Sequence, residues 1–216
     1  MTRLIDTIGE SVRERCKRAN LTPLEDEIRK CILRTFARTG NPPTVQEIMK
    51  IITVSSEDIV HRAIRKLRKA DMLTTKANVI TSAYPFSADK TRNTVVFADG
   101  HSVNALCATD ALGIHFMLGE DITIRSLCPE CNHEITIFLK NGMIVSRDPA
   151  GVIEYVKART SCGCKTETCC PHINFFCGMD HLEQWKARTP SSGDGEIFTI
   201  DEALEDSRMI FGDYLE

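Results

Sequence analysis

The cysteines are the side chains with the richest chemistry in this sequence, and they are unevenly distributed. Eight of the ten lie between Cys107 and Cys177, and only Cys16 and Cys31 lie outside that segment. In a reducing compartment, clustered cysteines more often bind metal or react than form disulfides. The second half of the chain is therefore where we expect the chemistry.

Cys107 and Asp110 are spaced so that they can act together. The segment 106–118 has an apolar helical pattern that ends at Gly119, and residues three apart share a helix face. A carboxyl beside a thiol can take its proton and pass it on, and a thiol at or near a helix start has a lowered pKa. The alternative interpretation is a cysteine that fills the core beside an unrelated acid.

A second thiol group comprises Cys169 and Cys170, with His172 close behind and the pair Phe175 and Phe176 after it. Thiolates are soft ligands that favour soft metal ions. This group is therefore a second candidate for binding a soft metal ion.

Cys128 and Cys131 form a Cys-Pro-Glu-Cys knuckle of the kind found in zinc ribbons, and Cys162 and Cys164 follow later. Four thiolates can hold a structural zinc ion, so we take these four as a candidate zinc site. The alternative is a tight turn with unused thiols. The three other thiols are predicted to be core residues: Cys16, Cys31 and Cys177.

The N-terminal part of the chain is predicted to be mainly helical. Apolar periodicity predicts helices over 4–19, 23–38, 45–51 and 56–70, and a small hairpin or wing follows within 71–86. Helices with a tight turn before the last one, then a wing, are typical of a winged helix-turn-helix domain.

The charge of this part is consistent with DNA binding. Residues 1–92 carry 18 Lys and Arg against 11 Asp and Glu, a net charge of +7, whereas residues 93–216 carry a net charge of −10. A basic helix at 56–70 lies where a recognition helix would be. The alternative is a helical cap with a solvated basic face and no DNA contact.

The remaining chain alternates strands and helices. Strands are expected at 94–98, 122–127, 134–139, 143–146 and 173–177, with a strand or helix at 152–157 and helices at 180–188 and from Thr199 to about 211. We therefore predict an α+β protein: a helical winged-helix-like domain at 1–90, then a mixed α/β catalytic domain with antiparallel strands at 91–216. With no run of 18 apolar residues and no signal peptide, we expect a cytosolic protein without a membrane partner.

At the motif level the sequence resembles the organomercurial (alkylmercury) lyases. Residues 106–112 resemble that family's Cys-Ala-x-Asp-x-Leu motif, and the spacing to Cys128 is similar. Residues 148–151 resemble its Pro-Ala-Gly segment, and residues 170–176 its Cys-x-His-x-x-Phe-Phe segment; 183–185 also fit. The resemblance covers about residues 94–190.

This resemblance implies a lyase that cleaves carbon–mercury bonds by protonolysis. Carried over by position, Cys107 and Cys170 are the mercury-binding thiols and Asp110 is the acid. No cofactor is implied, because mercury is the substrate ion. The Hg(II) product would pass to small thiols or to a mercuric reductase.

The sequence departs from the family pattern beside Cys170. The family's vicinal Cys-Cys pair would place its second cysteine at Pro171. Alignment on His172 and the phenylalanine pair selects Cys170, while a slip of one residue would select Cys169, which stays a candidate mercury ligand.

A rival hypothesis is a metal-responsive DNA-binding regulator, in which the thiols sense a metal and the N-terminal domain binds DNA. Asp110 distinguishes the two hypotheses, because a sensor needs thiolates but no proton donor.

Overall fold

The computed structural model describes residues 12–157, 169–190 and 193–215. Within these ranges no helix combines the length and the apolar character needed to cross a bilayer. Cys162 and Cys164 lie outside the described residues, as do residues 4–11 of the helix expected at 4–19.

Helices make up the N-terminal part: α2 (Val12–Ala19), α3 (Pro23–Thr39), α4 (Val45–Ile52) and α5 (Glu57–Lys69). Local caps explain the bounds of two of them. Thr22 with Glu25, and Thr44 with Glu47, form reciprocal capping boxes at the starts of α3 and α4. Gly40 ends α3 at φ 70°, in the left-handed region that glycine enters freely.

The hairpin expected after α5 is present as antiparallel strands β1 (Leu73–Lys76) and β2 (Val79–Ala83). It is not an isolated wing. Strand β3 (Phe86–Ser87) pairs with β2 on one side and with β5 (Ser102–Ala105) on the other, so the hairpin is the edge of a larger sheet. The winged-helix assignment and the domain boundary at residue 90 stay predictions.

The larger sheet continues through β4 (Asn93–Phe97), β5 (Ser102–Ala105), β6 (Ile122–Leu127), β7 (Glu134–Lys140) and β8 (Met143–Asp148). Its eight strands run in the order β1-β2-β3-β5-β4-β6-β7-β8, and every neighbouring pair is antiparallel. Side chains along β7 alternate between exposed or half-buried and buried, as expected for a sheet with one face on the core. The α+β prediction is confirmed.

A smaller antiparallel sheet has the order β10-β9-β11, formed by β9 (Ile153–Lys157), β10 (Ile173–Phe176) and β11 (Gly195–Thr199). Residues 152–157, for which the sequence was compatible with either a strand or a helix, thus contain strand β9. Helix α8 (Met179–Arg188) follows β10, and α9 (Ile200–Phe211) begins at a Thr199–Glu202 capping box. Strand β11 was not predicted, because its short, mostly exposed sequence is defined only by pairing with β9.

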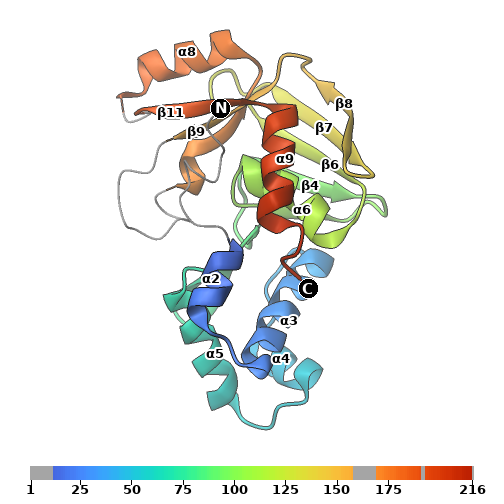
Figure 1. The fold of residues 1–216 in the computed structure, drawn as a ribbon, viewed down its shortest axis with the longest axis vertical. Helices are drawn as coiled ribbons and strands as arrows, with labels where there is room; N and C mark the ends of the chain where they lie inside the picture. Colours follow the sequence, from blue (N-terminus) through green and yellow to red (C-terminus); the bar gives the residue numbers. More distant parts are fainter. Residues whose placement is uncertain (1–11, 158–168, 191–192, 216) are drawn as a thin grey trace.

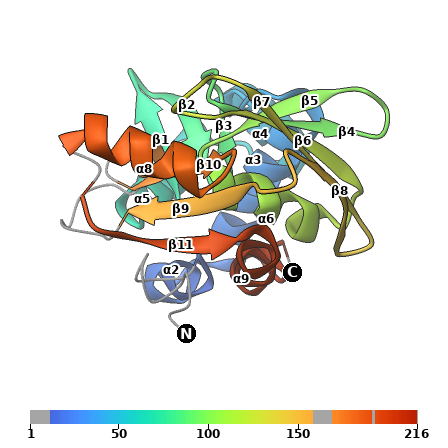
Figure 2. The ribbon, with the colours of Figure 1, turned by 90° about the horizontal axis from the view of Figure 1, so that it is seen from above.

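Helix α6 (Ala108–Leu118) is the centre of the fold (Figures 1 and 2). It packs on β4, β5, β6 and β10, and α9 covers it from another side. The contact with α9 is close: a Cβ added at Gly113 would lie 2.1 Å from the ring of Phe211. Because α6 is surrounded, groups at its first turn are withdrawn from water.

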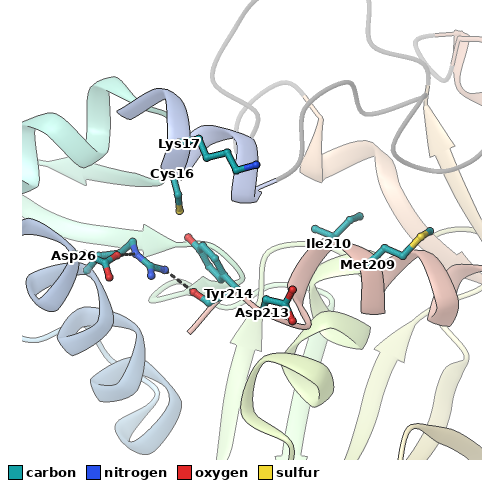
Figure 3. Close-up of a pocket in the computed structure, with 8 residues that line it drawn as sticks. Cys16, Lys17, Asp26, Met209, Ile210, Asp213 and Tyr214 are labelled. Carbon is teal, nitrogen blue, oxygen red and sulfur yellow. Dashed lines mark hydrogen bonds and ion pairs between the residues drawn. The ribbon is translucent and has the colours of Figure 1, made fainter. Parts of the chain in front are cut away.

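The C-terminal segment is tied to the N-terminal helices through Arg29 of α3. Its Nη1 donates to the backbone oxygen of Tyr214 at 2.8 Å, and its guanidinium lies 4.8 Å from the centre of the Tyr214 ring (Figure 3). A cavity of about 300 Å³ lies beside this contact, lined in part by Cys16 and Met209. None of the site residues expected from the sequence lines it.

Candidate active site

Cys107 sits where strand β5 turns into helix α6. It is the N-cap of α6, with extended backbone angles, and not an interior residue as the sequence pattern indicated. Its Sγ accepts a hydrogen bond from the backbone N–H of Asp110 at 3.4 Å and lies 3.0 Å from Oδ2 of the same residue. The cap geometry therefore holds thiol and carboxyl against each other.

Cys170 reaches the same point from a distant part of the chain. It begins the short 3-10 helix η1 (Cys170–His172), which leads into β10. Its Sγ lies 3.8 Å from Oδ2 of Asp110. One ligand atom from each of Cys107, Asp110 and Cys170 lies within 4.8 Å of the others, and these side chains are 2–5% exposed. The fold thus brings the three sequence-predicted residues into one buried cluster.

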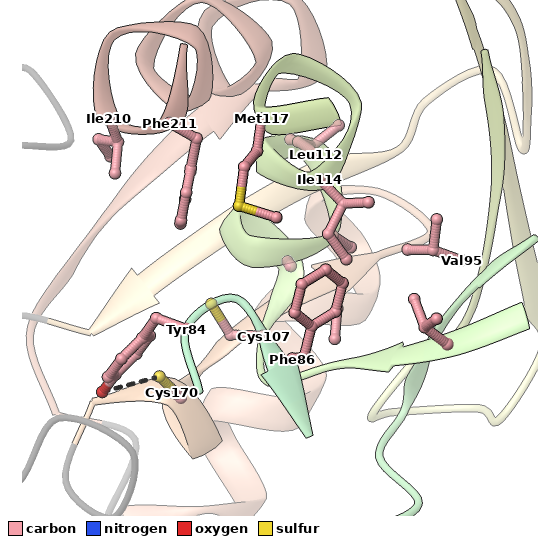
Figure 4. Packing of buried hydrophobic residues seen from close by; sticks show 14 of the residues in the cluster. Tyr84, Phe86, Val95, Cys107, Leu112, Ile114, Met117, Cys170, Ile210 and Phe211 are labelled. Atoms are coloured by element: carbon pink, nitrogen blue, oxygen red, sulfur yellow. Dashed lines mark hydrogen bonds between the residues drawn. The ribbon is translucent and has the colours of Figure 1, made fainter. Parts of the chain in front are cut away.

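Tyr84 is a member of this cluster that sequence reasoning missed. Its hydroxyl lies 3.9 Å from Sγ of Cys170, and the residue is 3% exposed (Figure 4). Arg15 lies over its ring at 4.8 Å from the centre. The one signal in the sequence is that this tyrosine lies in an apolar segment, which suggests burial. A buried tyrosine hydroxyl needs a polar partner, so such a residue is a candidate for a polar site.

Burial decides the charge state of the two thiols. Burial, with the hydrogen bond to Cys170 and the nearby Asp110 carboxylate, raises the pKa of Cys107 well above its ordinary value. The hydrogen bond with Cys107 lowers the pKa of Cys170, but burial and Asp110 outweigh it, and this pKa is raised as well. The expectation that a helix start lowers the pKa of Cys107 is wrong, because water is excluded.

Cys169 is buried next to Cys170 but occupies a different position. Its backbone oxygen accepts a hydrogen bond from the N–H of His172 at 2.9 Å, which closes the turn of η1. Among the described residues, the sulfur that clusters with the ligand atoms of Cys107 and Asp110 is that of Cys170 and not that of Cys169.

A second buried acid, Glu154 of β9, supports the first turn of α6 and was not singled out from the sequence. Thr109 donates its hydroxyl hydrogen to Oε1 of Glu154 at 2.7 Å, and within the described chain Oε2 has no hydrogen-bond partner. Burial, reinforced by repulsion from Asp206 and Asp110, raises the pKa of Glu154 to about 8. The residue is therefore mostly uncharged at neutral pH.

The zinc site predicted at Cys128, Cys131, Cys162 and Cys164 stays a prediction, because the last two residues lie outside the described residues. Cys128 and Cys131 lie together, but their neighbours are Cys177 and His181, and all four ligand atoms lie within 4.8 Å of one another. Cys177 is half-buried and packs against the core as predicted, and its sulfur also belongs to this group.

Comparisons of the sequence and of the structure with known proteins all find alkylmercury lyases. The family model described as MerB, alkylmercury lyase, matches residues 86–212. Alkylmercury lyases from Bacillus cereus and Clostridium butyricum are each 24% identical over 118 residues, which span 55% of this chain and 53% of each relative. A solved structure described as the mercury-bound form of MerB2 superposes with a TM-score of 0.77 at 21% identity, covering 95% of this chain and 99% of that one.

Proposed function

Because this chain belongs to the alkylmercury lyase family, we propose that it cleaves the carbon–mercury bond of organomercury compounds by protonolysis. The observation that carries the proposal is the convergence of the Cys107 and Cys170 sulfurs with a carboxylate oxygen of Asp110 in one buried cluster. Two soft ligands suit a mercury ion, and an acid beside them suits proton transfer to carbon.

The first step is capture of the organomercury cation by a thiol. Both thiols hold their protons at neutral pH, since their pKa values are raised, so binding must release a proton. Oδ2 of Asp110 lies 3.0 Å from Sγ of Cys107 and is positioned to accept it. The thiolate so formed bonds to mercury.

The second thiol makes the mercury-bound carbon basic enough to accept a proton. When it joins the first on mercury, two sulfurs push electron density through the metal onto carbon, and its own proton leaves the site. Asp110 then delivers the proton that it holds to carbon as the carbon–mercury bond breaks. The hydrocarbon departs, and Hg(II) remains on two thiolates. One thiol proton ends on carbon and the other in solvent, which balances the reaction.

Burial makes this proton transfer effective. The first turn of α6 is closed off from water: Ala108, Thr109 and Asp110 are all buried, and the capping Cys107 is 2% exposed. Without water, the Asp110 proton has few competing acceptors and the charges interact strongly. We further propose that Hg(II) leaves to small thiols or to a mercuric reductase, and that the protein works in the cytosol, where such thiols are plentiful.

Turnover tests the proposal directly. Reduced protein is incubated with a methylmercury or phenylmercury salt and excess small thiol, and methane or benzene in the headspace is measured by gas chromatography. We expect hydrocarbon in amounts exceeding the protein, together with Hg(II). Tight binding of the organomercury salt with no hydrocarbon from either substrate would refute lyase activity and favour a carrier or sensor.

The regulator hypothesis is not favoured. The family match runs through the sheet and the thiol cluster, over residues 86–212, and the matched relatives are lyases. Asp110 sits against both sulfurs, where a sensor has no use for a proton donor.

A further inference from the structure

The structure assigns a second metal site: we propose that Cys128, Cys131, Cys177 and His181 bind a structural zinc ion. This site is separate from the buried cluster of Cys107, Asp110 and Cys170, with which it shares no ligand. The inference stands independently of the proposed lyase activity.

The four residues come from two turns that are distant in sequence. Cys128 and Cys131 belong to the turn between β6 and β7 in the eight-stranded sheet. Cys177 directly follows β10 of the smaller sheet, and His181 lies in the first turn of α8. One ligand atom from each residue lies within 4.8 Å of all the others.

The separations fit a tetrahedral zinc ion. Bonds of about 2.3 Å to sulfur and 2.0–2.1 Å to nitrogen require edges of about 3.8 Å between sulfurs and about 3.5 Å between sulfur and nitrogen. Sγ of Cys131 lies 3.8 Å from Sγ of Cys177. Nδ1 of His181 lies 3.6 Å from Sγ of Cys128 and 3.3 Å from Sγ of Cys131.

The backbone of the first turn is already shaped to present its sulfurs. The N–H of Cys128 donates to the oxygen of His133 at 3.0 Å, and the N–H of Asn132 donates to the oxygen of Cys128 at 2.9 Å. Asn132 has φ 56°, which reverses the chain. The N–H of His133 also donates to Sγ of Cys131 at 3.5 Å, an outer-shell contact that suits a thiolate ligand.

The two turns are also joined away from the sulfurs. Arg188 at the end of α8 forms an ion pair with Glu130, which lies between the two cysteines of the knuckle. This contact positions α8 over the turn and so helps to place His181 beside the thiols.

The donor set selects the ion. Three thiolates and one imidazole in a tetrahedron are typical of zinc. Four protein ligands leave no open position, which marks a structural site and not a catalytic one. An ion here would link the larger sheet to the C-terminal end of β10. The N-terminal end of the same strand is connected to Cys170 through η1. Zinc would therefore stabilise the element that carries the second thiol.

Metal analysis tests the site. Protein expressed with zinc and purified without chelators is analysed by inductively coupled plasma mass spectrometry. We expect one zinc ion per chain in the wild type, in the matched control Cys16→Ser, and in the double variant Cys107→Ser/Cys170→Ser. We expect loss of zinc in Cys131→Ser, a substitution at an exposed side chain, and in His181→Ala.

Cobalt substitution supplies a second readout that does not depend on activity. Co(II) added to the metal-free wild type and to the double variant should give a sulfur-to-cobalt charge-transfer band and tetrahedral ligand-field bands, both absent from Cys131→Ser. Circular dichroism verifies that each variant is folded. Treatment with a zinc chelator should lower the thermal midpoint of the wild type, of Cys16→Ser and of the double variant, and should leave that of Cys131→Ser unchanged. A wild type that binds neither metal, or zinc lost in the double variant but kept in Cys131→Ser, would overturn the proposal.

Discussion

Sγ of Cys107 lies 3.0 Å from Oδ2 of Asp110 because Cys107 caps helix α6 and Asp110 lies in the first turn of the same helix. The backbone N–H of Asp110 donates to the same sulfur at 3.4 Å. Thiol and carboxyl are thus fixed to each other by one turn of α6, before any substrate arrives. This preorganisation is what a proton relay needs, since geometry held in advance costs no reorganisation during the reaction.

Replacing Asp110 by Asn or Ala should stop hydrocarbon release while mercury binding persists, because both thiols remain. A general acid typically contributes about 10²–10⁴-fold to a rate, and we expect a loss in turnover of at least that order. Single-turnover hydrocarbon release and binding of the organomercury salt are measured on the same samples. Asp121→Asn, beyond the other end of α6, serves as the control and should keep the wild-type rate. Normal turnover in Asp110→Ala would remove this residue from the mechanism.

Replacing Cys170 by Ser should be far more damaging than replacing Cys169. Both side chains are buried, 5% and 7% exposed, so the pair is matched in environment. Of these two sulfurs, the one that belongs to the buried cluster with Cys107 and Asp110 is that of Cys170. We expect Cys170→Ser to lose turnover and Cys169→Ser to retain most of it, as measured by hydrocarbon yield. The reverse order would show that the second mercury ligand is Cys169.

Glu154 should make the protein less stable as pH rises. Its pKa is raised from 4.5 to about 8 in the folded state, so between these values the folded state keeps a proton that the unfolded chain has released. The contribution of Glu154 to the free energy of unfolding is therefore fully present below about pH 4.5 and is lost as pH rises to about 8. The effect is on the order of a few kcal/mol.

The variant Glu154→Gln isolates this effect, because glutamine cannot ionise. Urea unfolding of both proteins across this pH range should give similar stabilities at acid pH. With rising pH, we expect the variant to become the more stable of the two. Parallel stability curves for the two proteins would mean that Glu154 does not titrate in this way.

The N-terminal helices should show no tight sequence-specific DNA binding at physiological salt, although α5 carries exposed basic residues. Part of its basic face is used internally: Nζ of Lys66 lies 2.6 Å from Oε2 of Glu25 in α3 and 2.9 Å from the oxygen of Asn20. Selection from a random duplex library, followed by fluorescence anisotropy, measures the affinity. Nanomolar binding to a selected sequence would revive the regulator hypothesis.

Local interactions made many elements of this fold predictable. Capping boxes at Thr44 and Thr199 mark helix starts within a few residues of sequence, and the structure confirms both. Strands were expected at 134–139 and 143–146, and the structure has them as β7 and β8, joined by a hairpin turn at Asn141 and Gly142. Strands β5 and β11 were missed, because each is only four or five residues long and is defined by its pairing, with β4 and with β9, more than by its own sequence.

The sequence by itself determined which residue types carry the chemistry. The spacing of Cys107 and Asp110 places them on one helical turn, and the local motif around Cys170 identifies a second thiol. Tertiary structure alone decided that Cys170 meets the other two, that burial raises the thiol pKa values, and that the knuckle at Cys128 lies beside Cys177 and His181. The physical reason is that spacing fixes only contacts within a turn or a helix. Desolvation and ligand sets depend on segments brought together across the whole chain.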